Sequence, residues 1–524
     1  MSAFLNESSD SAASTADPRR TREAVDWASA NGLMVRSSST PLFDHAPFTL
    51  HPTPYPSALY ARALELAAPF GLLVDRCARD SEWLRKTLAA AAEADPFVAK
   101  QMEVFEAVES DGGPTQHAFL GIHRSDYMLH QPDGASAPEG LLQVELNTIA
   151  ASFGCLSTQV SRMHRYLARL EGSEKKTTVS IPGHDTTRNL AAGIAAAHAH
   201  YVDSTAASRD AAVASAAPLA VLFVVQDGET NSVDQRMLEY AVVDAINGTN
   251  NMGGQKLNNV GDEKQDPATV VRVIRRSLTA LADKSVCKDA AMLSKGGRKA
   301  AESPRRSLIV DGHEISVVYF RAGYTPRDYP SQAEWDARLF VERTHAIKCP
   351  SIAYQLVGAK KAQQQLAVEG EVERFLSVDE GLAKVRQSFA GLYEVDDASV
   401  AMVLARGGKG FVMKPQREGG GNNIYEGDIP AALASMKDAA ERRAYIFMSM
   451  IRPPALSSVL VRSGKASSPQ PTLSELGIYS TFLGDGASIF RNEFAGHLLR
   501  TKPLEATEGG VASGYSVLDS PELV

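Results

Sequence analysis

The sequence has few cysteines, and none of them lies near another. The 524 residues include only four, Cys77, Cys155, Cys287 and Cys349, and no C-x-x-C spacing. Zinc sites and disulfide frameworks need clustered or regularly spaced cysteines, so the sequence favours neither. We expect buried or incidental thiols in a reducing compartment, with the cytoplasm as the default.

The sequence also lacks segments that would direct it into or across a membrane. No run approaches the roughly 18 apolar residues of a membrane span. The first twenty residues have neither the charged start nor the apolar stretch of a secretory signal, and their acidic residues Glu7, Asp10 and Asp17 argue against a transit peptide. We expect residues 1–20 to form a mobile tail and the protein to have no membrane partner.

Excess positive charge is missing as well. The formal net charge of −8 argues against a nucleic-acid-binding protein, which would normally carry a basic surface. The basic loop at 295–306 leaves that role as a weak alternative, since such charges are most simply a solvated surface. With 44% hydrophobic and 22% charged residues, the composition is that of a soluble globular protein, and the length suits roughly two to four domains.

The sequence shows no Ser/His/Asp or Cys/His arrangement for nucleophilic catalysis. What it does have is a glycine-rich loop, KPQREGGGNN, at residues 414–423, which is neither a Walker A nor a G-x-G-x-x-G motif. A strand over Phe411–Met413 presents Lys414, and Pro415 ends that strand because it cannot donate to a ladder. Three consecutive glycines favour bare N–H groups that contact phosphate oxygens.

A carboxylate in the same loop points to a metal. Glu418 would repel phosphate unless a divalent cation lay between them, and Mg²⁺ bound by carboxylates and phosphate oxygens is such an arrangement. The loop therefore predicts a nucleoside-triphosphate site with metal. A solvated glycine-rich surface loop is the alternative interpretation.

Strict alternation of apolar and polar residues over 142–147 predicts a strand. One face of it would carry Gln143, Glu145 and Asn147, and the core face would carry Leu142, Val144 and Leu146. A carboxylate and an amide on one face suit a hard cation, although an exposed strand face would alternate in the same way. The small-residue turn 148–154 then leads to a helix over about 156–170, whose start offers N–H groups to an anionic substrate.

The rest of the chain indicates a mixture of helices and strands. Helical patterns run from Thr21 to about Gly113, interrupted by a proline-rich extended connector. The apolar run 219–225 fits a buried parallel strand. A polar turn follows, and a capping box from Ser232 to Gln235 opens the next helix. A strand, a polar turn and a capped helix together form the crevice where open α/β sheets bind ligands. A second capping box runs from Ser331 to Glu334. Further expected elements are a helix over 270–278, strands over 315–320 and 444–451, and a hairpin at Gly484-Asp485-Gly486.

The block KPQREGGGNN resembles the ATP-binding glycine-rich loop of the eukaryotic-type glutathione synthetase family, a family of ATP-grasp ligases. The resemblance covers most of the chain in at least six separated blocks, all in family order. This chain departs from the family in two places: Ala322 stands where the family usually has aspartate, and Ser449-Met450 stand where Glu-Lys is common.

The resemblance implies an α+β/α/β ATP-grasp fold with an inserted α/β substrate-binding domain. The implied division is a tail at 1–20, a helical part with the first portion of the core at 21–217, the inserted domain at 218–357, and a second ATP-grasp part with glycine-rich lid loops at 358–524. A homodimer is a further implication. The region 247–306 looks like an insertion relative to the family.

The resemblance also assigns roles to residues. The implied metal ligands, for two Mg²⁺ per subunit, are Glu145, Asn147 and Glu418. The implied ATP-binding residues are Glu145, Lys360, Lys414, Pro415, Gln416, Arg417, Glu418, Gly419, Gly420, Gly421, Asn422, Asn423, Tyr425, Met448, Ser449, Met450, Ile451, Glu475, Lys502 and Glu508. The implied substrate-binding residues are Arg124, Ile149, Ala150, Ala151, Ser152, Glu229, Thr230, Asn231, Gln235, Arg321, Tyr324, Arg500, Val511 and Ala512. The implied catalytic residues are Arg124, Lys414 and Arg500.

The implied reaction is the ATP-dependent ligation of γ-glutamylcysteine to glycine through an acyl phosphate, giving glutathione, ADP and phosphate. Two alternatives remain open from the sequence: a ligase that uses another amine, such as β-alanine, and a catalytically silent nucleotide-binding subunit.

Overall fold

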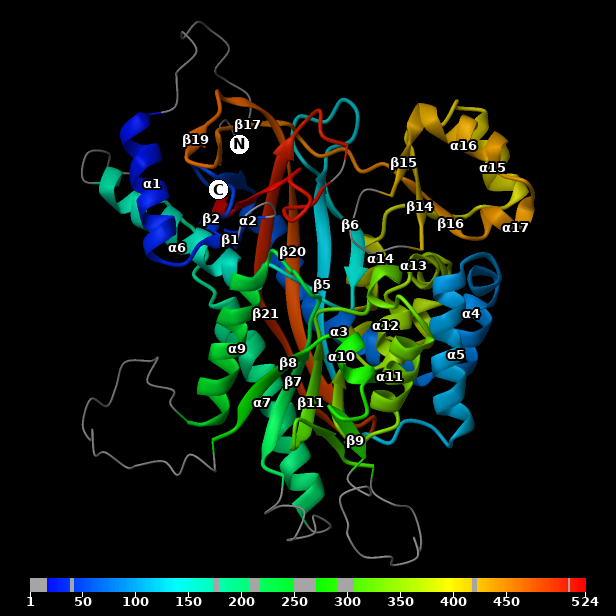
Figure 1. The fold of residues 1–524 in the computed structure, drawn as a ribbon. Helices are drawn as coiled ribbons and strands as arrows, with labels where there is room; N and C mark the ends of the chain where they lie inside the picture. Colours follow the sequence, from blue (N-terminus) through cyan, green and yellow to red (C-terminus); the bar gives the residue numbers. More distant parts are fainter. Residues whose placement is uncertain are drawn as a thin grey trace, which may run out of the picture.

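The computed structural model describes residues 17–37, 42–172, 179–206, 217–248, 270–289, 306–416, 422–507 and 509–524 (Figure 1). The fold is mixed α/β, as predicted. It is organised around a large sheet with the strand order β19-β18-β3-β22-β21-β20-β5-β6, in which β17 also pairs with β20. The longest strands are β5 (Phe119–His130), β20 (Gln470–Gly484) and β21 (Ile489–Pro503), and the predicted hairpin joins β20 to β21. The other strands are β3 (Phe48–Thr49), β6 (Gly140–Asn147), β17 (Leu456–Ser458), β18 (Leu460–Arg462), β19 (Lys465–Ala466) and β22 (Val517–Asp519).

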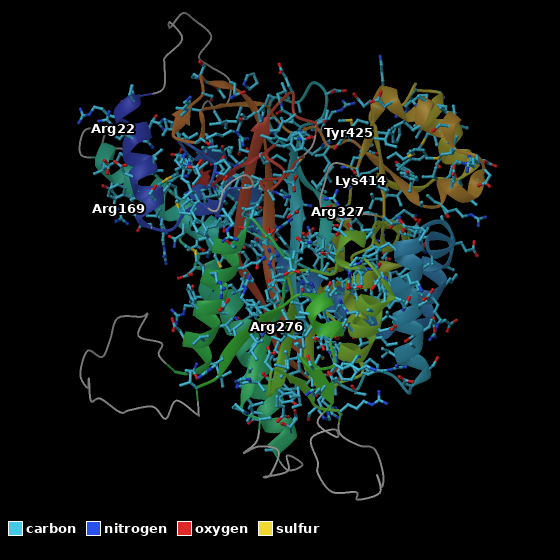
Figure 2. All side chains as sticks on the ribbon, in the orientation of Figure 1. Arg22, Arg169, Arg276, Arg327, Lys414 and Tyr425 are labelled. Atoms are coloured by element: carbon cyan, nitrogen blue, oxygen red, sulfur yellow. The ribbon has the colours of Figure 1, made fainter. Side chains whose placement is uncertain are left out.

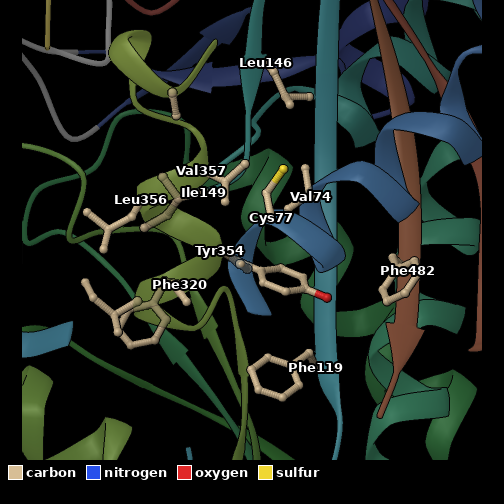
Figure 3. Packing of buried hydrophobic residues seen from close by; sticks show 14 of the residues in the cluster. Val74, Cys77, Phe119, Leu146, Ile149, Phe320, Tyr354, Leu356, Val357 and Phe482 are labelled. Carbon is tan, nitrogen blue, oxygen red and sulfur yellow. The ribbon is translucent and has the colours of Figure 1, made fainter. Parts of the chain in front are cut away.

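Helices cover both faces of the large sheet. Alternate residues of β20 belong to two separate cores, because side chains along a strand point to opposite faces. Leu476 and Ile478 join the core that includes helix α3 (Ala67–Arg79), whereas Tyr479 joins the core of helices α6 (Gly154–Gly172) and α7 (Thr186–Thr205). Figure 3 shows the first core, with Val74 and Cys77 of α3 near Tyr354 and Phe482. All four cysteines are buried and free, as predicted.

The remaining helices surround these cores. They are α1 (Pro18–Ala30), α2 (Ser57–Glu65), α4 (Ser81–Ala94), α5 (Pro96–Ser110), α9 (Ser232–Ile246), α10 (Leu278–Ala282), α11 (Gln332–Glu342), α12 (Ile352–Val357), α13 (Lys360–Ala367), α14 (Leu382–Ser388), α15 (Asp397–Leu404), α16 (Ile429–Ser435) and α17 (Ala439–Arg442), with 3₁₀ turns η3 (Pro326–Asp328), η4 (Val372–Arg374), η5 (Val378–Glu380) and η6 (Glu426–Asp428). The capping box from Ser331 to Glu334 at the start of α11 is confirmed.

Two predictions near the N-terminus need correction. Helix α1 begins at Pro18, inside the predicted tail, because Asp17 caps it and proline is favoured in a first helical turn. The segment predicted as mainly helical also contains short strands, β1 (Met34–Arg36), β2 (Phe43–His45), β3 and β4 (Thr53–Tyr55). The proline-rich connector contains one of these strands, β4, which pairs in parallel with β23 (Pro521–Leu523).

A second sheet has the order β8-β7-β11-β10-β9, with β12 also paired to β11. Its strands are β7 (Leu219–Val224), β8 (Arg272–Arg276), β9 (Cys287–Asp289), β10 (Leu308–Val310), β11 (His313–Phe320) and β12 (Ile347–Cys349). The buried parallel strand predicted at 219–225 is confirmed as β7, and the strand at 315–320 as β11. The helix predicted over 270–278 is wrong, because Val273 and Ile274 lie in the parallel edge strand β8 and Leu278 begins helix α10. Short apolar runs fit both periodicities, and β-branched residues favour the strand.

A third, antiparallel sheet has the order β13-β16-β14-β15. Its strands are β13 (Leu392–Glu394), β14 (Phe411–Pro415), β15 (Ile424–Tyr425) and β16 (Tyr445–Ser449). Figure 1 shows this sheet with α15, α16 and α17 at one corner of the molecule, beside β6. The strands predicted at 411–413 and 444–451 are confirmed.

The segment Ser57–Arg79, which contains α2 and α3, is long and apolar enough for a membrane span by length and composition, with a mean hydropathy of 1.3 over its best window. However, 56% of that window is buried inside the protein. Helix α3 packs against β5, β20 and β21. The apolar character of this segment is therefore explained by its place in the core.

An ion pair ties α3 to η5 and gives a prediction for acid stability. Both oxygens of Glu380 accept hydrogen bonds from Arg76, at 2.6 and 2.7 Å, and this pairing lowers the pKa of Glu380 from 4.5 to about 2. A lowered folded-state pKa stabilises the fold above pH 4.5, and this contribution is lost as the pH falls toward 2. Because Arg76 is partly exposed, solvent screening limits the expected cost of Arg76→Gln to about 1 kcal/mol at pH 7.

Urea unfolding at several pH values checks this prediction. The difference between wild type and Arg76→Gln should shrink between pH 4.5 and pH 2. The exposed pair Lys384–Glu65 provides the control, and Lys384→Gln should have a smaller effect. A difference that is independent of pH would contradict the role of Glu380.

Candidate active site

A cavity of 470 Å³ lies between the large sheet and the small antiparallel sheet. Its walls come from β5, β6, β20 and β21 of the large sheet, from β14 and β16 of the small sheet, and from the loop after β6. Figure 2 shows Lys414 and Tyr425 of the small sheet beside β6.

The cavity brings together most of the site residues predicted from the sequence. Lining it are Arg124, Glu145, Asn147, Ile149, Ala150, Ala151, Ser152, Tyr324, Lys360, Lys414, Asn422, Asn423, Tyr425, Met448, Ser449, Met450, Ile451, Glu475, Arg500, Lys502, Val511 and Ala512. Predicted residues that do not line it are Glu229, Thr230, Asn231, Gln235, Arg321, Pro415 and Gln416. Predicted residues outside the described part of the chain are Arg417, Glu418, Gly419, Gly420, Gly421 and Glu508.

Strand register places the charged residues on one face of the large sheet. Arg124 of β5 lies opposite Asn147 of β6, and Glu475 of β20 lies opposite Arg500 of β21. Directly opposed residues share a face. Lys502 follows Arg500 by two residues along β21 and so lies on the same face.

The prediction that Gln143 shares this face is wrong. The pairing of β5 with β6 shifts, so that Glu145 lies opposite Asp126 but Gln143 lies opposite Tyr127, and Val144 is the extra residue of a β-bulge. A bulge reverses the alternation. The Gln143 amide therefore donates to Ser125 on the other face, at 2.7 Å.

Two lysines, Lys360 and Lys414, lie near the Glu145 carboxylate, and a third, Lys502, lines the same cavity. Lys360, at the start of α13, lies 2.9 Å from Glu145 and is only 5% exposed, so it is not a solvated surface lysine. Lys414 donates to the Val144 carbonyl at 3.0 Å, and Lys502 donates to the Thr507 carbonyl at 3.0 Å. Burial alone would raise the pKa of Glu145, but the nearby ammonium groups of Lys360 and Lys414 outweigh it and hold the pKa well below its usual range. Glu145 is therefore ionised at neutral pH, and these lysines are placed to receive further anionic groups.

Arginines occupy the other side of the cavity. Arg124 forms a two-point ion pair with Asp126, with distances of 2.6 and 2.8 Å. Arg500 contacts both Asp126 and Glu475. Sequence reasoning missed Asp126, although its i, i+2 spacing from Arg124 on a strand could have placed both on one face.

The residues present fit a magnesium–triphosphate complex. Glu145 offers carboxylate oxygens, and the Asn147 amide nitrogen donates to Asp126 at 3.0 Å, which leaves the Asn147 amide oxygen for a cation. Such hard oxygen ligands are those Mg²⁺ prefers. Within the described ranges, no cluster of three His, Cys, Asp or Glu side chains is placed to hold a metal; the third predicted ligand, Glu418, lies outside them.

The loop after β6 has an unusual backbone that several side chains hold in place. Ala150 and Phe153 have φ values of 52° and 72°, a region that non-glycine residues rarely adopt and that is common at functional sites. Arg321 donates to the Ala150 carbonyl, and Tyr479 donates to the Ser152 carbonyl. Arg321 therefore acts on the cavity through this loop.

The start of α6 does not offer the free N–H groups predicted from the sequence. The N–H groups of Phe153, Cys155 and Leu156 donate to the Asp234 carboxylate, at 2.9, 2.9 and 3.2 Å. Asp234, which is buried, already occupies the place that an external anion would take. It comes from α9, a helix distant in sequence, so the local pattern around 148–154 could not reveal it.

Asp234→Asn is expected to raise the KM for a substrate held by the loop after β6 about tenfold, with a smaller change in kcat. An amide keeps only one acceptor, so the N–H of Phe153 or those of Cys155 and Leu156 would face another donor, at a cost of about 1–3 kcal/mol. Steady-state kinetics check this. The matched control is Asp95→Asn, which removes another buried helix-capping carboxylate, at α5, outside the cavity. Equal effects of the two variants on KM would contradict a specific role of Asp234.

The capping box predicted at Ser232–Gln235 is wrong. Asn231 is the residue that precedes α9, and Gln235 instead donates to Glu229 at 3.3 Å and accepts from Arg275 at 2.6 Å. Glu229 also accepts from the Asn231 N–H. These residues form one group next to Arg321 and the loop after β6, and their substrate-binding role stays a prediction.

The end of the cavity near the small sheet is apolar. Leu142 and Val144, predicted to face the main core, pack instead in a small cluster with Val412, Met448 and Ile451. The N–H groups of Ser449 and Met450, which the resemblance assigns to ATP binding, already donate to the carbonyls of Gly391 and Gly410. A ligand at this end of the cavity would therefore have to use other backbone groups of the segment.

A second cavity of 880 Å³ adjoins the first at Tyr324 and Asn422, and Ala322 lines it. The turn around Ala322 has its own carboxylate. Asp328 accepts from the N–H groups of Gly323, Tyr324 and Thr325, at 2.8, 3.1 and 3.2 Å. The turn that holds Tyr324 at the cavity is thus stabilised without an acidic residue at position 322.

Comparisons with known proteins agree with this site. Residues 18–523 match the family model described as eukaryotic glutathione synthase, ATP binding domain. The chain is 37% identical over 511 residues to the glutathione synthetases of Bos taurus and Homo sapiens, covering 95% of both chains in each case. It is 36% identical over 513 residues to the chloroplastic glutathione synthetase of Solanum lycopersicum, covering 96% of this chain and 83% of that one.

A solved structure supports the fold. The glutathione synthetase-like effector from Globodera pallida, in its apo form, superposes with a TM-score of 0.70 and 20% sequence identity, covering 97% of this chain and 98% of that one. The fold and the lysine-lined cavity, together with the matches, define an ATP-dependent ligase. The chain belongs to the eukaryotic glutathione synthase family.

Proposed function

We propose that the 470 Å³ cavity joins γ-glutamylcysteine to glycine at the expense of ATP, giving glutathione, ADP and phosphate. The observation that carries this proposal is the convergence of Glu145, Lys360, Lys414, Arg124 and Arg500 on one cavity, although they are far apart in the sequence. Lysines and a carboxylate suit a metal-bound triphosphate, and arginines suit a substrate with several carboxylates.

The first step activates the peptide. An oxygen of the C-terminal carboxylate of γ-glutamylcysteine attacks the γ-phosphorus, the bond to ADP breaks, and an acyl phosphate forms. Such a transfer needs positioning and charge neutralisation more than covalent help from the protein. Lys360, Lys414 and Lys502 line the cavity, where they are placed to neutralise the phosphates. Glu145 and Asn147, together with Glu418 as the resemblance implies, would hold Mg²⁺, which would supply further positive charge to the phosphates.

In the second step, the glycine amine attacks the acyl carbon and phosphate leaves with the electron pair of the broken bond. The amine loses one proton as the amide forms. Arg124 and Arg500 would hold carboxylates of the substrates by charge-assisted hydrogen bonds. Water must be kept from the acyl phosphate, and the segment containing Gly509 and Gly510, which lines the cavity, is a candidate cover.

Finer features belong to the same proposal. We expect two Mg²⁺ per subunit and a homodimer, with the exposed side chains of Phe43 and Tyr240 available to a subunit contact. We also expect the inserted substrate-binding domain at 218–357, the range that contains all six described strands of the second sheet. The expected compartment is the cytoplasm, and since one relative is chloroplastic, cell fractionation tests it.

The test is a coupled ADP-release assay with γ-glutamylcysteine, glycine and Mg²⁺, omitting each in turn and identifying the product by mass. ADP release should require every component, and glutathione should form. Replacing glycine with β-alanine measures the preference for the amine. ADP release that does not depend on γ-glutamylcysteine, or no release at all, would contradict the proposal.

A further inference from the structure

The Asp126 carboxylate does not line the cavity, but it contacts three charged or polar residues that do. It is fully buried on β5, with an exposed fraction of 0%. One oxygen accepts from Arg124 Nε at 2.6 Å. The other accepts from Arg124 Nη2 at 2.8 Å, Asn147 Nδ2 at 3.0 Å and Arg500 Nη2 at 3.0 Å. A single buried carboxylate therefore contacts three residues from three different strands.

These contacts fix the orientation of the amide at position 147. The Asn147 nitrogen donates to both Asp126 and the Arg124 carbonyl, so the amide cannot rotate by half a turn without placing its oxygen against two acceptors. A carboxylate only accepts hydrogen bonds. Asp126 thus selects the rotamer in which the Asn147 oxygen is directed away from it and is left for a cation.

The same contacts fix the two arginines. Arg124 is only 5% exposed, so its guanidinium must have a buried anionic partner. Arg124 also lies over a glycine: a Cβ atom added at Gly477 of β20 would come within 2.7 Å of Asp126 Oδ1 and 2.8 Å of Arg124 Cδ. Real Cβ atoms do not approach so closely, so the ion pair occupies space that any other residue at position 477 would fill.

We propose that Asp126 is a positioning residue that holds Arg124 and Arg500 for the peptide substrate and at the same time orients the Asn147 amide for the metal. It thereby connects the peptide side of the cavity with the nucleotide side. This inference rests on the proposed function, because it assumes that the cavity binds γ-glutamylcysteine and a magnesium nucleotide.

Asp126→Asn provides the main test. The asparagine side chain is as large as that of aspartate, but its NH₂ group replaces one of the two accepting oxygens. This NH₂ group would face hydrogen-bond donors: either Arg124 Nε, or the nitrogens of Arg124, Asn147 and Arg500. We expect the dissociation constant for γ-glutamylcysteine, measured by calorimetry, to rise at least tenfold. The Mg²⁺ concentration that half-saturates binding of a non-hydrolysable ATP analogue should rise about fivefold or more. Neither quantity depends on turnover.

The matched control is Asp75→Asn. Asp75 is also a buried carboxylate that pairs with an arginine, Arg79, at 2.9 Å, and it accepts from Tyr354 at 2.6 Å, but it lies outside the cavity. This variant should lower the melting temperature while leaving both binding measurements unchanged. A purely structural Asp126 would give the same result as Asp75.

Gly477→Ala keeps the test decisive if Asp126→Asn does not fold. This substitution changes no charge but forces the Arg124–Asp126 pair to shift. The dissociation constant for γ-glutamylcysteine and the half-saturating Mg²⁺ concentration should therefore each rise by about threefold or more. If Asp126→Asn or Gly477→Ala protein folds and binds both ligands as the wild type does, the positioning role is overturned. Failure of the wild-type protein itself to bind γ-glutamylcysteine and the ATP analogue would instead overturn the proposed function.

Discussion

Glu145→Gln is expected to lower kcat about 10³-fold, the upper range for losing one electrostatic group at an active site. The Glu145 carboxylate lies 2.9 Å from Lys360, and its low pKa reflects the charges of Lys360 and Lys414. An uncharged glutamine removes the negative charge beside Lys360 and Lys414 and also removes a ligand for magnesium. Because the phosphates must then be bound without a correctly placed cation, both phosphoryl transfer and nucleotide binding should suffer.

Steady-state kinetics with a Mg²⁺ titration check this prediction. The structure offers a close control on the same strand: Gln143 faces the other side of the sheet because of the bulge at Val144. Gln143→Ala should change kcat less than threefold. If folded Glu145→Gln protein turns over at nearly the wild-type rate, Glu145 does not bind the metal or support the phosphates as proposed.

Arg500→Met is expected to lower kcat/KM for γ-glutamylcysteine about 10³-fold, equivalent to about 4 kcal/mol, within the range for truncating one partner of a buried charge pair. Arg500 contacts Asp126 and Glu475 simultaneously. Without Arg500, the buried carboxylates of Asp126 and Glu475 would lose the positive charge that lies between them. Burial, together with the charges of Asp126 and Glu145, already raises the pKa of Glu475 even with Arg500 present.

The Arg500 variant should therefore have a pH signature. Removing Arg500 raises the folded-state pKa of Glu475 further, so the folded state binds more protons than the unfolded state above pH 4.5, and stability falls as the pH rises toward the folded pKa. Thermal melting of Arg500→Met between pH 5 and pH 8 measures this. Arg500→Lys restores one charge without the planar fork and should recover part of the activity. A variant that is less stable at every pH but has unchanged kcat/KM would show that Arg500 is only structural.

Much of the site could be predicted from the sequence, because short motifs carry their own local structure. Pro415 ends β14, and the run 219–225 forms a buried parallel strand. Arg500 and Lys502 share a strand face. Each of these features depends only on residues within one element.

The predictions that failed depended on pairing between elements. The bulge at Val144 is a property of the register between β5 and β6, so the alternation of β6 alone placed Gln143 on the wrong face. Strand β8 is extended because β7 offers it a parallel partner, whereas its own sequence fits a helix as well.

The buried carboxylates were hidden for the same reason. Asp234 belongs to an ordinary amphipathic helix and only acquires its role when α9 packs against the start of α6. Asp126 became recognisable when β5, β6 and β21 lay side by side, since its partners come from all three strands. Spacing along the chain does not report such convergence.

A crystal structure with Mg²⁺ and a non-hydrolysable ATP analogue would show whether the lysines and Glu145 bind a magnesium nucleotide. We expect the triphosphate to lie between Lys360 and Lys414 and the base to lie against Val412 and Met448. We also expect cation density that joins the phosphates to Glu145, Asn147 and Glu418. A nucleotide bound elsewhere, or Glu145 and Glu418 too far apart to share a cation-bridged triphosphate, would contradict it.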